Sequence, residues 1–431
     1  MKEFLKLGSL AAAATFLPGL RASLLLILVG AAYGSTAATT LGLSAQFLAL
    51  TIVAVVGLSI TTLFRIRRMG AGDKVSDIAV NSGSTAFAGA LLIVIVAIIS
   101  GALIPIVLSD IDAKQFLPYW YISIVSLVAV IFSSWQTGLL QARNADSKVL
   151  KIGLISAAAS VGSAVVIVQA LADDPVLALS LIAISNALID VITLVSRSRA
   201  VGVVWGVELD GTWGRAFKIF WSHKVKAMRT LPEVAKATAD GLILMMVFLT
   251  AGLVATWHDV EAGAAVLTAV ALMRSLVLPL KQFGMVGGRL AVGAGPEKAL
   301  LLRSMTMVVS AILLAGAGVL VALKVLMILP PTISTTLVVL LALQLLLEPV
   351  TGFLFASMKI IHKPDFAMVQ LFRISILFTI PGLVVLAVLG LVTPELVWTV
   401  LLSARVIFAI VVVLAVKKIG LAGGITHAKS R

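Results

Sequence analysis

The sequence predicts an all-α polytopic membrane protein with about twelve transmembrane helices, arranged as two similar lobes of about six helices each. Only 12% of the residues are charged and 61% are hydrophobic, whereas a soluble domain carries about 25% charged residues. Apolar runs of about twenty residues recur along the chain, and each is long enough to cross a hydrocarbon core as a helix. A third observation, a turn sequence that occurs once in each half, predicts the two lobes.

Twelve spans follow from the apolar runs, and six of them lie on each side of the segment 197–228. In chain order we predict spans at 10–33, 45–64, 84–108, 118–141, 150–171, 175–196, 229–254, 262–289, 304–323, 332–358, 366–391 and 394–416. The first run is too long for a signal peptide, and eleven more follow it, so we expect it to be the first transmembrane helix. The predicted domains are an N-terminal lobe at 1–200, a cytoplasmic amphipathic linker at 201–228 and a C-terminal lobe at 229–431.

The positive charges of the loops predict the orientation of the chain. When alternate loops are assigned to alternate sides, one side collects nearly all of the basic residues, and the other side collects only Lys114 and Lys324. Because basic loops stay inside, we expect a multi-pass protein of the cytoplasmic (inner) membrane with both termini in the cytoplasm. The net charge of +14 lies in these short loops, so its expected partner is the lipid bilayer and not a nucleic acid.

The linker carries aromatic residues at helical spacing, namely Trp213, Phe217, Phe220 and Trp221, with basic residues between them. This pattern predicts an interfacial amphipathic helix whose basic residues meet anionic headgroups. The alternative is a partly disordered loop.

Residue types that carry most enzyme chemistry are scarce. The chain has no cysteine and four histidines, all of which fall in predicted loops or tails, and it contains no Walker loop. We therefore expect no enzyme activity, no bound metal and no cofactor other than a coupling ion.

The turn sequence 65–74 follows the second predicted span, and a similar sequence, 289–298, follows the eighth; both contain Gly-Ala-Gly and end in Lys. Glycine at a helix end adopts the left-handed conformation that stops a helix. Leu17-Pro18 and Leu231-Pro232 open the first and seventh spans in the same way. Because six is an even number, the duplicated lobes share an orientation, which predicts a pseudo-two-fold axis along the membrane normal and a cavity between the lobes.

Two six-helix lobes, an Arg-x-x-Gly-Ala-Gly-type turn after the second and eighth spans, and proline near the start of the first and seventh spans resemble the multidrug and toxin extrusion (MATE) family of the multidrug/oligosaccharidyl-lipid/polysaccharide (MOP) flippase superfamily. The resemblance covers nearly the whole chain. It implies a multidrug-efflux antiporter, which exports a small organic or amphipathic substrate by alternating access coupled to Na⁺ or H⁺ entry. Each lobe supplies the other with an interface, so we expect a monomer.

Asp240 and Glu348 lie at mid-membrane depth on the seventh and tenth predicted spans, where an ionisable side chain is by default a functional hypothesis. The resemblance implies that carboxylates at these places bind the coupling cation in the C-terminal lobe, and Gln344, one turn before Glu348, could add an amide oxygen. We expect the two acids to sit together within reach of water. Lys236, one turn before Asp240, is expected to leave when the cation arrives, or to form a static ion-paired stripe with Asp240 and Glu233.

Four bases fall within predicted spans, namely Arg21, Arg274, Lys281 and Arg405. If they line the central cavity, they would bind an anionic or lipid-linked, phosphate-bearing substrate, because guanidinium groups match phosphate and carboxylate geometry. This predicts a flippase or anion exporter as the alternative function. The bases could instead pair within the lobes with Asp190 or Glu348, and Lys281 could snorkel to the interface.

Overall fold

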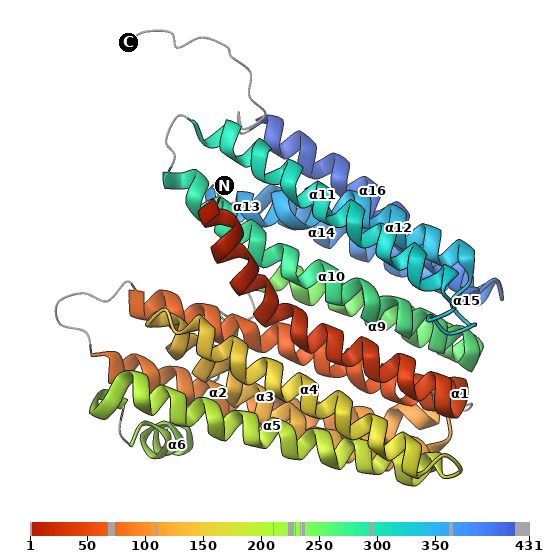
Figure 1. Ribbon diagram of the computed structural model, residues 1–431, viewed down its shortest axis with the longest axis horizontal. Helices are drawn as coiled ribbons and strands as arrows, with labels where there is room; N and C mark the ends of the chain where they lie inside the picture. Colours follow the sequence, from red (N-terminus) through yellow and green to blue (C-terminus); the bar gives the residue numbers. More distant parts are fainter. Residues whose placement is uncertain are drawn as a thin grey trace, which may run out of the picture. The chain divides into compact units, whose positions relative to one another are not determined.

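The computed structural model describes residues 2–67, 74–108, 111–209, 211–222, 228, 230–232, 234, 238–293, 297–361 and 365–418. These residues are mostly helical and contain no strand (Figure 1), which confirms the predicted all-α class. Among them, eleven helices are long and apolar enough to cross a membrane. The repeated Gly-Ala-Gly turns fall largely outside the described residues.

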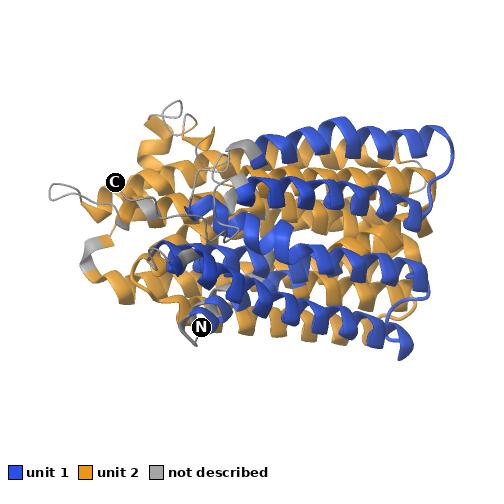
Figure 2. Cartoon of the chain, turned by 90° about the horizontal axis from the view of Figure 1, so that it is seen from above, with its two compact units in different colours: residues 1–19, 272–431 blue, residues 20–271 orange. Residues whose placement is uncertain are grey.

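The helices divide between two compact units (Figure 2), unit 2 at Leu20–Ala271 and unit 1 at Met1–Gly19 with Leu272–Arg431. The first helices in chain order are α1 (Lys2–Arg67), α2 (Val75–Val107), α3 (Ala113–Ala142), α4 (Asp146–Ala170), α5 (Pro175–Trp205), the 3₁₀ turn η1 (Gly206–Leu209) and α6 (Thr212–Ser222). They are followed by α9 (Ala239–His258), α10 (Val260–Gly293), α11 (Lys298–Val325), α12 (Thr335–Glu348), η3 (Pro349–Leu354), α13 (Phe355–Ile361), α14 (Asp365–Ile374), η4 (Ser375–Thr379), α15 (Ile380–Val388) and α16 (Pro394–Lys418).

Helix α1 contains the first two predicted spans. It breaks at Gly34, whose φ of 82° is a conformation that side chains other than glycine rarely adopt. The second helical segment starts directly after this glycine, about ten residues earlier than its apolar run predicts. Residues 35–44 are rich in small polar side chains, which lower their hydropathy, but Thr39 and Thr40 are buried and Thr39 Oγ1 donates to the Val260 carbonyl at 3.0 Å. Because α1 consists of two helical segments, the eleven long apolar helices correspond to the twelve predicted spans.

Unit 2 is built around α2, α3, α4 and α5, which run side by side (Figure 1). Glycines allow close contact, since a Cβ at Gly138 would lie 2.7 Å from the Ser59 carbonyl oxygen. Helix α9 and the first part of α10 belong to this unit, and Leu267 packs against Gly42 and Gly252. The division into units follows these contacts, whereas the predicted lobes at 1–200 and 229–431 follow the repeat and stay a prediction.

The predicted linker contains a helix, α6, that packs on α2. Thr212, Ala216 and Phe220 form its buried face, while Trp213 and Phe217 are exposed beside it. The Phe87 ring on α2 lies 5.3 Å from the Phe217 ring and stacks on the Phe220 ring at 6.0 Å. The amphipathic pattern of this segment therefore produces a helix, and its position at a membrane interface stays a prediction.

Unit 1 contains an irregular tenth span. Helix α12 continues into the π-helical segment η3 at Pro349 and then into α13. Proline has no backbone N–H to complete the α-helical ladder, which accounts for the change of register at this point. Gly284 on α10 lies against the same segment, because its Cβ would be 2.5 Å from the Phe353 carbonyl oxygen, and Ser357 Oγ donates to the Gly284 carbonyl at 2.9 Å. The backbone just after Glu348 is thereby held close to α10.

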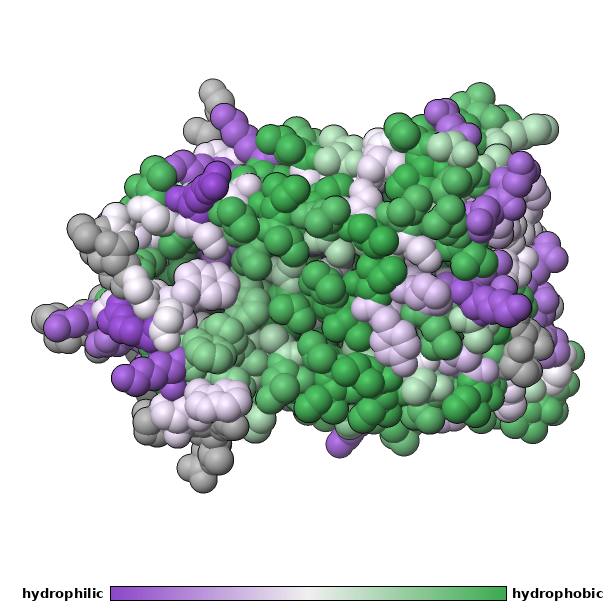
Figure 3. Space-filling view, turned by 90° about the horizontal axis from the view of Figure 1, so that it is seen from below, coloured by the Kyte–Doolittle hydropathy of each residue, from purple (hydrophilic) through white to green (hydrophobic). Residues whose placement is uncertain are grey.

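Large apolar side chains cover much of the surface. On α2 the exposed ones include Leu92, Ile99, Leu103 and Ile106, and in Figure 3 apolar residues dominate the visible face while hydrophilic residues gather toward its ends. Such continuous apolar exposure is unfavourable in water and is typical of a hydrocarbon environment. The chain is therefore a multi-pass membrane protein.

Candidate functional site

Glu348 and Gln344 lie one turn apart on α12 and are both fully buried, with 0% of their surface exposed. Ser334 is the N-cap of this helix, and its hydroxyl accepts a hydrogen bond from the Leu337 amide at 3.1 Å. Its buried apolar residues, Leu337, Leu341 and Leu345, share the inward face with the two polar residues. The sequence pattern of α12 thus carries an amide and a carboxylate into the interior of unit 1.

Arg405 on α16 reaches Glu348 from a second helix of the same unit. Its Nη2 lies 3.1 Å from Glu348 Oε1, and the two side chains are 9% and 0% exposed. No basic residue lies within one helical turn of Glu348 in the sequence, so the sequence of α12 alone does not predict Arg405 as its partner. Arg405 thus pairs with a carboxylate of its own unit, as the alternative interpretation of this arginine predicted.

The polar atoms of this cluster are largely unsatisfied. Among the described residues, neither Oε1 nor Nε2 of Gln344 has a hydrogen-bond partner, and the same holds for both carboxylate oxygens of Glu348 and for Arg405 Nε. The contact with Arg405 is therefore a close ion pair without hydrogen-bond alignment. An unsatisfied buried polar group costs about 1–3 kcal/mol, so the cluster has unused capacity for a polar ligand.

Gly352, one turn after Glu348 in η3, makes room for the carboxylate. A Cβ at this glycine would lie 2.9 Å from Glu348 Oε2, which is closer than real Cβ atoms normally approach. No sequence motif predicted this role of Gly352. We call Gln344, Glu348, Gly352 and Arg405 the α12 cluster.

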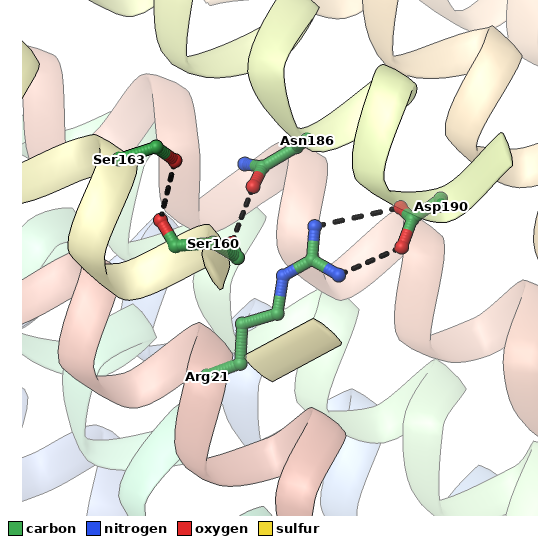
Figure 4. A network of polar contacts seen from close by, with 5 residues as sticks. All are labelled: Arg21, Ser160, Ser163, Asn186 and Asp190. Atoms are coloured by element: carbon green, nitrogen blue, oxygen red, sulfur yellow. Dashed lines mark hydrogen bonds and ion pairs between the residues drawn. The ribbon is translucent and has the colours of Figure 1, made fainter. Parts of the chain in front are cut away.

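A second ion pair, between Arg21 and Asp190, lies in unit 2 (Figure 4). Arg21 Nη1 and Nη2 lie 2.7 and 3.4 Å from the two carboxylate oxygens of Asp190, and the side chains are 17% and 7% exposed. Asn186, one turn before Asp190 on α5, accepts a hydrogen bond from the Ser160 hydroxyl of α4. The Ser163 hydroxyl donates to the Ser160 carbonyl at 3.0 Å. This pair is bidentate, and the hydrogen-bonded group of Asn186, Ser160 and Ser163 lies beside it.

The other predicted site residues that the structure describes, Asp240, Arg274 and Lys281, lie on α9 and α10. Asp240 is buried in the first turn of α9 in unit 2, whereas Glu348 belongs to unit 1, so the predicted joint site of the two acids stays a prediction. Arg274 is buried on α10, Lys281 is half-buried on the same helix, and both have interactions with other groups. Lys236 and Glu233 lie outside the described residues.

The described residues contain no conventional metal centre. Within the described residues, no group of three or more His, Cys, Asp or Glu side chains could hold a metal ion. The α12 cluster instead combines one carboxylate with one amide, both of which are oxygen donors suited to a hard cation.

Comparison with known proteins finds likeness in structure and not in sequence. No family model matches the chain, and no curated protein matches it. An inward-facing multidrug resistance MATE family transporter of the MOP superfamily is similar with a TM-score of 0.72 and 13% identity, over 96% of this chain and 98% of that chain. A eukaryotic MATE transporter is similar with a TM-score of 0.67 and 11% identity, over 98% and 96%.

A third similar structure is a MOP superfamily transporter from Pyrococcus furiosus, described by a binding pocket of reverse polarity that suggests a different function. Its TM-score is 0.60 at 13% identity, over 98% of this chain and 96% of that chain. All three likenesses span nearly the full length of both partners. The predicted resemblance is confirmed at the level of the fold: the chain has the twelve-helix fold of the MATE family transporters of the MOP superfamily.

Proposed function

We propose that the chain is a secondary active transporter of the MATE type, which exports a small organic or amphipathic substrate by alternating access coupled to cation entry. The likeness in fold to MATE transporters over nearly the whole chain supports the class. The observation that carries the coupling site is the fully buried, unpaired amide of Gln344 one turn from the buried carboxylate of Glu348. We propose that the coupling cation binds there.

The same observation favours Na⁺ over H⁺. A proton would neutralise Glu348 and add a single O–H donor, which can satisfy only one acceptor such as the Gln344 carbonyl oxygen. A metal cation would take oxygen from both side chains and so satisfy more of the buried polar atoms. Asp240 would bind the same cation if a conformational change in the transport cycle brought it to the α12 cluster.

Export coupled to a cation is favoured over the anion-carrying alternative. Two of the four bases proposed to attract an anionic or lipid-linked substrate, Arg21 and Arg405, each contact a carboxylate of their own unit. Their positive charge is then neutralised locally, and less of it is available to a phosphate group.

The test is binding of radioactive Na⁺ to the purified full-length chain, followed by Na⁺-driven export of a fluorescent organic cation from proteoliposomes. Glu348→Gln and Gln344→Leu are expected to abolish Na⁺ binding and Na⁺-driven export. Gln136→Leu is the matched control, because Gln136 is an equally buried glutamine that bonds to Ser198 in unit 2. Unchanged Na⁺ binding in both α12 variants would reject the proposed site.

A further inference from the structure

Two positive groups, the proposed coupling cation and the Arg405 guanidinium, would share the single negative charge of Glu348. This inference rests on the proposed function and deepens it. Within the part of the chain that the structure describes, Glu348 is the carboxylate of the cluster, and Arg405 already contacts it. A bound Na⁺ beside an undisturbed Arg405 would leave two positive charges against one buried carboxylate. An uncompensated charge is strongly unfavourable in a buried site, so the cation and the guanidinium compete.

The geometry of the contact makes Arg405 displaceable. Arginine carries five N–H donors, but Nε has no partner among the described residues, and neither carboxylate oxygen of Glu348 accepts a hydrogen bond from the guanidinium although Nη2 lies 3.1 Å from Oε1. Releasing the guanidinium therefore breaks an ion pair and no aligned hydrogen bond with Glu348. Arg21 differs, because its two terminal nitrogens hold both oxygens of Asp190.

The surroundings of Glu348 are arranged to hold the carboxylate in place while its partner changes. Gly352 leaves space for Oε2 on the side of η3, and α10 packs against that segment through Gly284. The long arginine side chain, in contrast, can move its charged end without a shift of α16. The shorter carboxylate side chain therefore has less freedom to move than the guanidinium.

We propose that Arg405 is a tethered counter-cation, which neutralises Glu348 when no coupling ion is bound and must be displaced for Na⁺ to bind. This gives the cation-free carrier a neutral site, so that it can change conformation without carrying a bare carboxylate through a low-dielectric interior. It also weakens Na⁺ binding, because the ion has to replace an existing partner. Weak binding favours release of the ion on the side where its concentration is low.

The experiment compares the Na⁺ affinity of variants of the full-length chain in detergent. Arg405→Met and Arg405→Gln remove the charge, and each is expected to tighten Na⁺ binding by about tenfold or more, which is the lower end for a close charge pair. Arg405→Lys keeps a tethered charge and should bind Na⁺ about as weakly as the unmodified chain. Arg303→Met is the matched control at an exposed position of α11 in the same unit and should leave the affinity unchanged.

The outcomes separate this inference from the proposed function. If Glu348→Gln abolishes Na⁺ binding while Arg405→Met and Arg405→Gln leave the affinity unchanged or remove binding, the counter-cation is rejected and the site stands. If neither the α12 variants nor the Arg405 variants alter Na⁺ binding, both proposals fail.

The double variant Glu348→Gln with Arg405→Met leaves no buried charge in the pair, so it is expected to fold even where a single variant does not. It should bind no Na⁺, and retained binding would overturn both proposals.

Discussion

The two arginine–carboxylate pairs of this chain have the same chemistry but different surroundings. In unit 2, Arg21 holds Asp190 with two nitrogens, and the neighbouring Asn186 bonds to Ser160. In unit 1, Arg405 Nη2 lies 3.1 Å from Glu348 Oε1 without a hydrogen bond to it, and the neighbouring Gln344 bonds to no described residue. A buried ion pair therefore cannot be assigned a role from its charges alone. The hydrogen bonds that its neighbours make, or fail to make, distinguish a structural pair from a pair that awaits a ligand.

The largest expected effect is on stability, through the pair in unit 2. Asp190→Asn leaves the partly buried Arg21 guanidinium without its carboxylate, and breaking a fully buried pair costs about 3–5 kcal/mol, which is an upper bound for this one. We expect a lower melting temperature in detergent. A double-mutant cycle, Asp190→Asn with Arg21→Met, should give a larger coupling energy than the cycle Glu348→Gln with Arg405→Met. Equal coupling energies would remove the structural distinction between the two pairs.

The next effect concerns the two amides that lie one turn before each acid. Asn186→Leu leaves the Ser160 hydroxyl without its acceptor and should cost about 1–3 kcal/mol of stability. Gln344→Leu removes an amide that has no described hydrogen bond, so it should be neutral or stabilising in the absence of Na⁺.

Thermal unfolding with and without Na⁺ measures both amide variants. Only the Gln344 variant should lose the stabilisation that Na⁺ confers on the unmodified chain, because a ligand that binds only the folded state stabilises it. If the Asn186 variant lost that stabilisation instead, the result would contradict the site at the α12 cluster and indicate an ion site in unit 2.

Most of the helical framework was predictable because it depends on local composition. A run of about twenty apolar residues defines a span without knowledge of its neighbours, and seven of the observed helical segments agree with their predicted spans to within about six residues at both ends. Residues 35–44 of α1 show the limit of this reasoning. Their threonines and serines read as a loop, but they are buried against other helices, and Thr39 bonds to the Val260 carbonyl.

The candidate site was predictable only in part. Gln344 and Glu348 share a helix face, so their proximity follows from helical spacing. Arg405 and Gly352 reach the same carboxylate through packing between helices and through the π-helical register of η3, neither of which is encoded in a short motif. The partition of Asp240 into unit 2 likewise depends on how α9 packs and not on its sequence.

The smallest effect tests how closely Glu348 is fitted into its place. Gly352→Ala puts a Cβ 2.9 Å from Glu348 Oε2, so the carboxylate must move. We expect weaker Na⁺ binding by about tenfold, which corresponds to about 1.4 kcal/mol, measured by binding of radioactive Na⁺. Gly316→Ala is the matched control, since nothing lies within 4 Å of a Cβ at that position of α11 and alanine favours the helix there by about 1 kcal/mol. If both variants bind Na⁺ equally well, the carboxylate tolerates displacement, and unit 1 does not hold Glu348 in a fixed position for an ion.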